Sequence, residues 1–438
     1  MSPTRRELLA WGAAAAGGLA VAACSTGSPK PVPSPSNTGS VTSAESLAEL
    51  ALWTAQRGVD AGSYGIGGAL VETSTGRVLQ TMPNRVFRTL AAGGTFVQDP
   101  TAHGERQLMS WYLAQRETLG LLDPAGLTVV TTLDPCLMCT SALLTVGVNV
   151  GVVAIDDYSG INYDSSGLFN DLPESLRPQT MATFGYYAVD GGRAFQGSRA
   201  IAYADEPITQ DTLDSCSSIY STSADTVRSA RRASGAAPSS LTDPSTNPAA
   251  IDVIRAFQVT FPEAFTVKVR DPRLPDRRVY DVLVDVVRRS PGATNAVAYI
   301  DPFGNLVTTQ ADQQQVNALS TAFALCTRTY AQTRYALVDA EATLSIAEQS
   351  LTNPNYGTFV FLVAPDPFTP TGMFDIGAYG STMGGAATPA IPSAFQYFEL
   401  PAGVTETQLQ DVIYPLPPLY SENIKISPQR VLRAFTCC

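Results

Sequence analysis

The single histidine of this 438-residue chain, His103, precedes a carboxylate, Glu105, by two residues. Further downstream, a β-branched run leads into Pro135 and a Cys-x-x-Cys pair, Cys136 and Cys139. Such a pair at a helix start lets two thiolates meet at one metal ion, and the helix N-terminus favours the thiolate form. One histidine as the third ligand leaves the fourth tetrahedral position open for water, which is typical of catalytic zinc. The sequence therefore predicts a Zn²⁺ site formed by His103, Cys136 and Cys139.

Each part of this pattern also has a simpler interpretation. Taken alone, the two cysteines could be a redox pair or a disulfide, and a lone histidine is usually an ordinary surface or core residue. The joint pattern favours a metal, because the histidine lies at a predicted helix start, beside a carboxylate and upstream of a strand that runs into the cysteines. Glu105 is predicted to be the general acid/base, since it can take a proton from zinc-bound water and return it to a leaving group.

These residues resemble the zinc nucleobase deaminases, whose signature is His-x-Glu followed by Pro-Cys-x-x-Cys. Residues 42–233 resemble a cytidine/deoxycytidylate-type deaminase domain, and segments 99–105 and 131–139 are similar to the tRNA adenosine and guanine deaminase branch. The resemblance implies a three-layer α/β/α sandwich and hydrolytic deamination of a free nucleobase or nucleoside, with release of ammonia. It also implies that Asn84 binds the base or ribose.

Two positions depart from that family. Gly104 stands where alanine is usual, and the smaller residue is expected to be tolerated at some loss of helix propensity. Asp134 stands where many members have glutamate. Neither residue is a predicted ligand or the predicted acid/base, so the departures leave the expected chemistry unchanged.

The rest of the first domain follows an alternating pattern. The chain is long enough for two or three domains. Within residues 42–233, predicted helices (42–54, 103–117, 134–145, 209–233) alternate with predicted strands (66–72, 77–80, 127–132, 151–155). A loop is expected over 84–101 and a linker over 234–250. This order predicts an α/β layer sandwich.

The C-terminal part, residues 251–438, is predicted to be a second, α+β domain of unknown role. We expect strands at 265–269, 279–284, 296–300 and 358–363, a helical region over 311–350, and a Pro- and Gly-rich stretch from 364 to 401. A structural or partner-binding module is favoured over a substrate-capping or dimerising one. Four further cysteines permit up to two disulfides of unassigned pairing: Cys216, Cys326, Cys437 and Cys438.

The N-terminus predicts an export signal and a tether. Arg5 and Arg6 precede an Ala/Gly-rich apolar stretch that ends at Cys24, an order that resembles a twin-arginine lipoprotein signal peptide. Residues 1–23 would be removed, Cys24 would carry the lipid, and the Pro/Ser-rich segment 24–41 would tether the protein to the outer face of the bacterial cytoplasmic membrane or cell envelope. The alternative is a short anchoring helix that is never cut.

Charge and hydropathy narrow the function classes. The net charge of −11 argues against nucleic-acid partners, which need a basic surface, and no long apolar tract follows the N-terminus, which excludes a polytopic membrane protein. Two classes remain: a zinc-dependent deaminase of small bases or nucleosides, and a non-catalytic, zinc-stabilised binding lipoprotein on a deaminase fold. Intact Glu105 favours the enzyme. The base that is turned over stays open, as does assembly into a homodimer.

Overall fold

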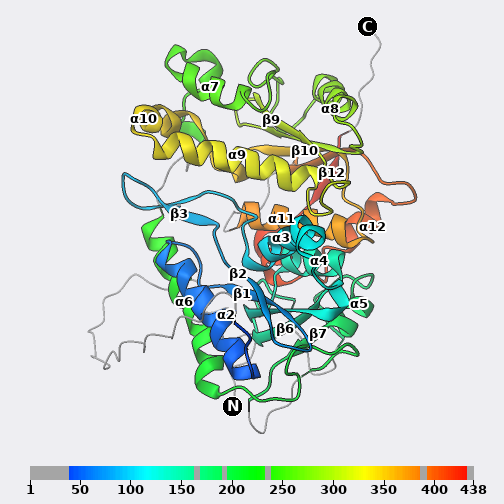
Figure 1. Cartoon of the computed structure of the whole chain (residues 1–438). Coiled ribbons are helices and arrows are strands. Elements are labelled where there is room, and N and C mark those ends of the chain that lie inside the picture. Colours follow the sequence, from blue (N-terminus) through cyan, green and yellow to red (C-terminus); the bar gives the residue numbers. More distant parts are fainter. Residues whose placement is uncertain (1–38, 162–167, 190–194, 232–237, 385–391, 432–438) are drawn as a thin grey trace. The chain divides into compact units, whose positions relative to one another are not determined.

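Two five-stranded sheets organise the computed structural model, which describes residues 39–161, 168–189, 195–231, 238–384 and 392–431 (Figure 1). All of these belong to one compact unit, residues 34–438. The predicted signal peptide, Cys24 and most of the predicted tether lie outside the described residues, as do Cys437 and Cys438. Among the described residues, none of the helices is long and apolar enough to cross a membrane.

The first sheet lies in what we call the N-terminal lobe, residues 39–231. Its strand order is β2-β1-β5-β6-β7, in which β1 pairs antiparallel with β2 and β5, whereas β5, β6 and β7 are parallel. The strands are β1 (Gly67–Glu72), β2 (Val78–Pro83), β5 (Leu127–Leu133), β6 (Asn149–Ala154) and β7 (Phe184–Tyr186). Every residue of β1, β5 and β6 is buried, as expected of strands covered on both faces.

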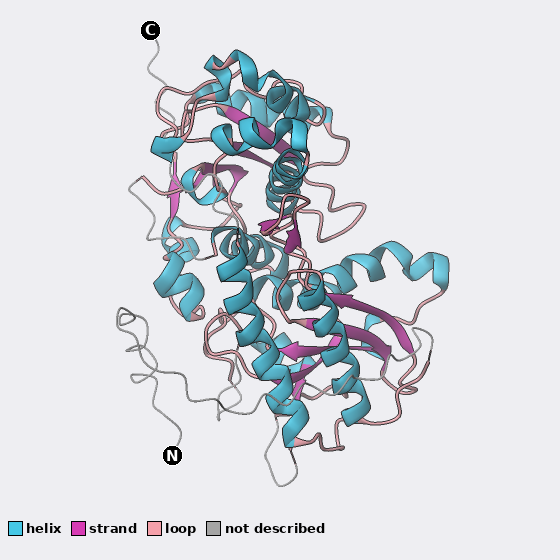
Figure 2. Ribbon diagram, turned by 90° about the vertical axis from the view of Figure 1, so that its left-hand side faces the viewer, coloured by secondary structure: helices cyan, strands magenta, loops and turns pink. Residues whose placement is uncertain are grey.

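Helices cover both faces of this sheet (Figure 2). Helices α3 (Gly104–Leu119) and α4 (Leu137–Val146) share one hydrophobic core with Leu70 and Val129, while α2 (Ala44–Asp60) and α6 (Gln210–Ala230) share another with Val71 and Val130. Successive strand residues point to opposite faces, so the two cores lie on opposite sides of the sheet. The predicted three-layer α/β/α sandwich is confirmed. A short helix, α5 (Arg177–Thr183), precedes β7.

The second sheet lies in the C-terminal lobe, residues 238–431. Its strand order is β12-β11-β10-β8-β9, with β8 antiparallel to β9 and β10, and β10, β11 and β12 parallel. The strands are β8 (Ala296–Ile300), β9 (Leu306–Ala311), β10 (Thr358–Val363), β11 (Phe395–Glu399) and β12 (Pro428–Arg430). The helices are α7 (Ile251–Gln258), α8 (Arg277–Arg289), α9 (Ala322–Asp339), α10 (Glu341–Ser350), α11 (Pro370–Met383) and α12 (Glu406–Asp411).

Shorter elements complete the description. A two-stranded sheet, β3 (Phe87–Thr89) with β4 (Thr95–Val97), interrupts the segment 84–101 that was expected to be a loop. Single helical turns occur at η2 (Pro124–Gly126), η3 (Pro238–Ser240), η4 (Pro244–Thr246), η5 (Pro248–Ala250) and η6 (Pro354–Tyr356), and η7 (Leu419–Ile424) is a π-helix. The described part of the predicted linker, 238–250, therefore consists largely of three such turns.

Several predictions for the C-terminal lobe are wrong. The expected strand 279–284 lies in helix α8, where the Asp276 side chain accepts a hydrogen bond from the Arg278 N–H and Val279 and Leu283, one helical turn apart, are buried. Residues 265–269 form no regular strand, although they make an isolated bridge and backbone hydrogen bonds to residues 304–306. The strands at 296–300 and 358–363 and the helices between them are confirmed, although the first of these helices begins at Ala322.

The Pro- and Gly-rich stretch 364–401 contains a buried helix, α11. Helix α11 packs along α4 of the N-terminal lobe, and a Cβ atom at Gly377 would lie only 2.3 Å from the backbone nitrogen of Met138. Glycine is needed there because the two backbones approach so closely. One hydrophobic core extends through both lobes and includes Leu108 of α3 and Phe374 of α11.

Candidate active site

The three predicted metal ligands come together at the start of two helices. His103 is the N-cap residue of α3, Cys136 is the N-cap residue of α4, and Cys139 lies in the first turn of α4. Their ligand atoms all lie within 4.8 Å of one another, and His103 Nδ1 is 3.5 Å from Cys136 Sγ. An ion about 2.0 Å from a histidine nitrogen and about 2.3 Å from each thiolate would fit among them.

The electrostatics of the site favour a thiolate at Cys136. A hydrogen bond from Cys139 holds the pKa of Cys136 well below its usual range, and the neighbouring charge of His103 acts in the same direction against the effect of burial. Burial raises the pKa of Cys139, as does its hydrogen bond to Cys136. Both sulfurs lie at the N-terminus of α4, whose partial positive charge stabilises anions.

Glu105 is placed beside the ligands without being one of them. It lies in the first turn of α3, is 2% exposed, and accepts a hydrogen bond of 3.0 Å from the Thr131 hydroxyl of β5 through Oε1. Its Oε2 accepts a 3.4 Å hydrogen bond from the Cys139 thiol. Burial raises the pKa of Glu105, and the charge of Cys136 raises it further. A carboxylate of raised pKa is suited to taking up a proton and giving it away again.

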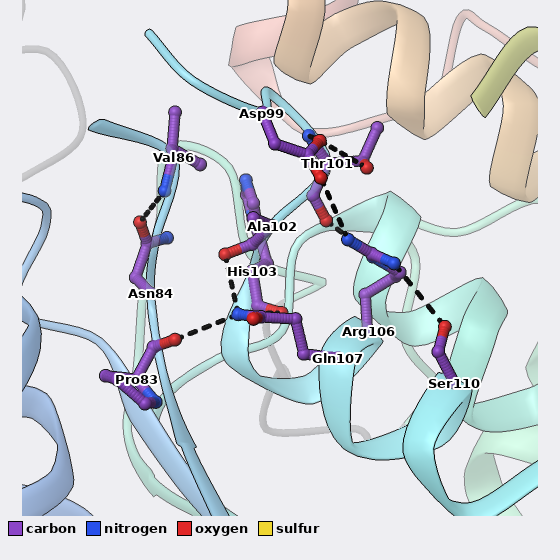
Figure 3. Close-up of polar contacts among 10 residues, drawn as sticks. All are labelled: Pro83, Asn84, Val86, Asp99, Thr101, Ala102, His103, Arg106, Gln107 and Ser110. Atoms are coloured by element: carbon purple, nitrogen blue, oxygen red, sulfur yellow. Dashed lines mark hydrogen bonds and ion pairs between the residues drawn. The ribbon is translucent and has the colours of Figure 1, made fainter. Parts of the chain in front are cut away.

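Asn84 lies directly after β2, and only one of the two polar atoms of its side-chain amide has hydrogen-bond partners among the described residues. Its Oδ1 accepts hydrogen bonds from the Ser63 hydroxyl at 2.6 Å and from the Val86 N–H at 3.0 Å. Its Nδ2 is buried and has no hydrogen-bond partner among the described residues. An unpaired buried amide is costly, so a ligand acceptor beside Nδ2 would be favourable. Figure 3 shows Asn84 beside the segment that leads to His103. The N–H of Arg85, the next residue, donates a hydrogen bond to the Ala102 carbonyl of that segment.

Two side chains of α3 fix the segment before His103 (Figure 3), and the sequence did not single out either of them. Gln107 Nε2 donates to the carbonyls of Pro83 and Ala102, both at 2.9 Å, which ties the end of β2 to this segment. Arg106 donates to the Thr101 carbonyl at 2.6 Å and forms a nearly buried ion pair of 3.4 Å with Asp99. In the sequence, only the motif over residues 99–105 indicated that this segment matters for the site.

The structure gives a reason for Gly104 and shows the surroundings of Asp134, the two residues that depart from the expected pattern. A Cβ atom at Gly104 would lie 2.5 Å from the Met82 carbonyl oxygen, so close packing of α3 on β2 requires the glycine that was expected merely to be tolerated. Asp134 is buried and accepts a 2.6 Å hydrogen bond from the Tyr186 hydroxyl. Burial raises the pKa of Asp134 to about 8. This residue braces the turn that leads to Cys136.

The C-terminal lobe also reaches the site, which the sequence did not indicate. The Leu137 N–H, at the start of α4, donates to the Tyr420 hydroxyl at 3.1 Å. The Leu419 N–H donates to the carbonyl of Tyr158 at 2.9 Å, in the loop whose Gly160 bridges to Cys136. Nothing in the local sequence around Tyr420 marks it as part of a metal centre.

The remaining described cysteines lie away from the site. Cys216 and Cys326 are free, buried thiols, and Cys216 packs in the core under α2, whereas Cys326 packs in the core of α9. Burial raises the pKa of Cys216 to about 12 and shifts that of Cys326 upward as well. Both are therefore protonated thiols at neutral pH.

Comparison with known families agrees with this geometry. Residues 41–155 match the cytidine and deoxycytidylate deaminase zinc-binding region. This segment contains all four residues predicted to carry the chemistry. The match supports the deaminase superfamily and zinc as the cofactor, and the His103, Cys136 and Cys139 geometry fits that metal.

Several solved structures are similar to part of the chain. One comes from studies of A-to-I editing by tRNA:A34 deaminases, with 27% identity over 28% of this chain and 85% of that one, at a TM-score of 0.23. A guanine deaminase from Nitrosomonas europaea has 16% identity over 43% of this chain and 88% of its own, at a TM-score of 0.26. A protein solved with 2,6-diaminopurine has 16% identity over 42% and 83%, at a TM-score of 0.25. The chain has no significant match among curated protein sequences.

Proposed function

We propose that the protein is a zinc-dependent hydrolytic deaminase that converts an exocyclic ring amine of a free nucleobase or nucleoside to a carbonyl and releases ammonia. The observation that carries the proposal is the position of Glu105. Its carboxylate is buried beside His103, Cys136 and Cys139, is oriented by Thr131, and is not needed to complete the three-ligand set. A protein that only bound zinc would have no use for a buried acid at this place.

The chain's own residues divide the chemistry between them. A zinc ion held by His103, Cys136 and Cys139 would lower the pKa of a bound water to about 7 and so supply a nucleophile near neutral pH. Glu105 would accept one proton of that water at a carboxylate oxygen and deliver it to a ring nitrogen of the substrate. As the water oxygen bonds to the amine-bearing carbon and the C–N bond breaks, Glu105 would carry the remaining water proton to the amine, which leaves as ammonia.

Asn84 is suited to hold the substrate. Its Oδ1 is fixed by Ser63 and Val86, which aims the unpartnered Nδ2 in one direction and lets it donate to a carbonyl or ring-nitrogen acceptor. A small substrate is favoured over tRNA because the chain carries a net charge of −11, which repels a polyanion.

The test is a pair of variants on one helix. Glu105→Gln should keep its zinc but lose activity by about 10² to 10⁴-fold or more, because its work is proton transfer. Glu117→Gln, an exposed substitution at the other end of α3, is the matched control and should behave as wild type. Purified protein is screened for ammonia release from guanine, adenine, cytosine and their nucleosides, and zinc is measured in each variant. Near-wild-type turnover by zinc-loaded Glu105→Gln would refute the mechanism.

We also propose that the protein is exported and lipid-anchored, which rests on the order Arg5, Arg6, apolar stretch, Cys24. Replacing both arginines by lysine should trap the protein in the cytoplasm, and Cys24→Ala should abolish labelling by a fatty-acid analogue. Unchanged export of the double-lysine variant would contradict the twin-arginine part of the proposal.

A further inference from the structure

The two sheets of the chain have the same topology. Taken in chain order, the strands of the first sheet are β1, β2, β5, β6 and β7, and those of the second are β8, β9, β10, β11 and β12. In both sheets the first strand lies between the second and the third and is antiparallel to both, and the third, fourth and fifth strands are parallel. Strand β12 thus corresponds to β7, and β8 to β1.

The registers of the two sheets agree as well. The β1–β2 pairing shifts between its fourth and fifth residues, Leu70 and Val71, and the β8–β9 pairing shifts between its fourth and fifth residues, Tyr299 and Ile300. A row of paired residues crosses each sheet in the same way: Gln80, Leu70, Val129, Val150 and Phe184 in the first, and Thr308, Tyr299, Phe359, Phe395 and Pro428 in the second. A one-residue slip in any pair would break this agreement, so chance is a poor explanation.

The helices correspond too, and the correspondence shows what the C-terminal lobe lacks. Helices α3 and α9 each join the second strand to the third, and α4 and α11 each join the third to the fourth. The N-cap residue is Thr321 in α9, where α3 has His103, and Thr369 in α11, where α4 has Cys136. Counted from these caps, Phe323 replaces Glu105 and Gly372 replaces Cys139. No metal ligand and no acid/base is retained at these positions.

The two lobes meet through corresponding helices. Helix α11 packs on α4, its own counterpart, and Gly377 brings the backbones close together at Met138. Contact between equivalent surfaces is the mark of a two-fold, isologous interface between identical subunits. Here both surfaces belong to one chain.

The C-terminal lobe places one hydroxyl at the metal centre. Tyr420 is fully buried, its ring packs on Gly380 of α11, and its oxygen accepts the Leu137 N–H, a donor that α4 itself cannot satisfy. Leu137 directly follows Cys136 in the chain, so this bond holds the backbone that carries one of the predicted metal ligands.

We propose that the C-terminal lobe is a second, metal-free copy of the N-terminal fold, docked on α4 as a partner subunit would be, and that it supplies Tyr420 as a positioning residue for the ligand Cys136. The proposal rests on the proposed function only for the catalytic meaning of the metal centre. The bond to the Leu137 N–H fixes the start of α4 and with it the orientation of Cys136, and contacts outside the ligand set govern how strongly ligands hold a metal.

The test uses metal binding in the full-length chain and needs no substrate. Tyr420→Phe keeps the ring and removes only the hydroxyl, and it should bind Zn²⁺ about 10- to 100-fold more weakly in competition with a chromophoric chelator. In Co²⁺-substituted protein, its thiolate-to-cobalt charge-transfer absorption should shift. Tyr330→Phe is the matched control, because it also loses a buried hydroxyl bond of the C-terminal lobe, the 2.6 Å bond to the Thr352 carbonyl, far along the chain from the metal ligands.

Every outcome is decisive. Wild-type zinc affinity together with an unchanged cobalt spectrum in Tyr420→Phe would overturn the proposal, and so would zinc loss that accompanies loss of the folded far-UV spectrum, since the role would then be structural. Binding of two zinc ions per chain, or zinc retained by Cys136→Ala/Cys139→Ala, would contradict a metal-free second copy. Failure of the protein to deaminate any base would leave these readouts untouched and would refute only the proposed function.

Discussion

Gly104→Ala should disturb the active site although it adds only a methyl group. That group would lie 2.5 Å from the Met82 carbonyl oxygen, whereas ordinary contact begins at 3.4 Å, so α3 and β2 must part by about 0.9 Å. The two nearest atoms, the carbonyl oxygen and carbon of Met82, belong to the backbone and cannot rotate away as a side chain could. Overpacking of this kind costs about 1–3 kcal/mol, against a gain of about 1 kcal/mol from the higher helix propensity of alanine. We expect a net loss of stability of about 0–2 kcal/mol.

The effect on catalysis should exceed the effect on stability. Gly104 is bonded to His103 and Glu105, so a shift of α3 moves a metal ligand and the proton carrier together, and a misplacement of about 1 Å can cost about 10²-fold in rate. The assay is kcat/KM for a turned-over base together with thermal unfolding and zinc content. Gly126→Ala is the control, because its added methyl would meet only the Leu122 side chain at 3.4 Å. A Gly104→Ala variant as active and as stable as Gly126→Ala would refute the argument.

Two further predictions concern buried polar groups. Asn84→Ala should lower kcat/KM by an amount equivalent to about 1–3 kcal/mol of activation free energy, while zinc content stays unchanged. Equal kcat/KM in the variant and the wild type would exclude Asn84 from substrate binding. Asp375 is a buried residue of α11, and burial raises its pKa to about 7. Between about pH 4 and pH 7 the native state therefore binds a proton that the unfolded chain has already released, so the free energy of unfolding falls as the pH rises through this range. Asp375→Asn should therefore raise the thermal midpoint increasingly over that range and level off above it, which a series of unfolding curves from pH 4 to pH 9 would check.

The metal centre could be predicted from the sequence because its ligands are few, chemically distinctive and tied to helix starts. Histidine and cysteine are the usual zinc ligands, so the residue types of His103, Cys136 and Cys139 by themselves indicate metal binding. The residues that support the site do not stand out in this way. Thr131 at Glu105, Gln107 before His103 and Tyr420 at the start of α4 are common residue types whose roles depend on long-range packing. Gly104 is a similar case, since its requirement arises from a neighbouring strand that the local sequence does not reveal.

The C-terminal lobe was harder to predict for reasons that individual segments make clear. In residues 279–284 the apolar positions fit a strand and a helix equally well, and the capping side chain of Asp276 decides for the helix. The sequence does not predict helix α11 because Gly372, Gly377 and Gly380 lower helix propensity, whereas in the folded chain all three lie too close to neighbouring atoms for a Cβ to fit. The shared register of the two sheets could not be predicted, because it depends on how the strands pair in the folded chain. Equivalent positions in the two sheets, such as Leu70 and Tyr299, carry different residues.

The packing of α11 on α4 has a consequence for how the protein behaves at low concentration. Two subunits that complete each other's sites separate on dilution, so their specific activity depends on protein concentration. Here the completing surface is joined to α4 by the chain itself, and its effective concentration is fixed by that connection. The contact of α11 and Tyr420 with α4 should therefore persist in a single molecule at any protein concentration, and any self-association must use a surface other than this face of α4.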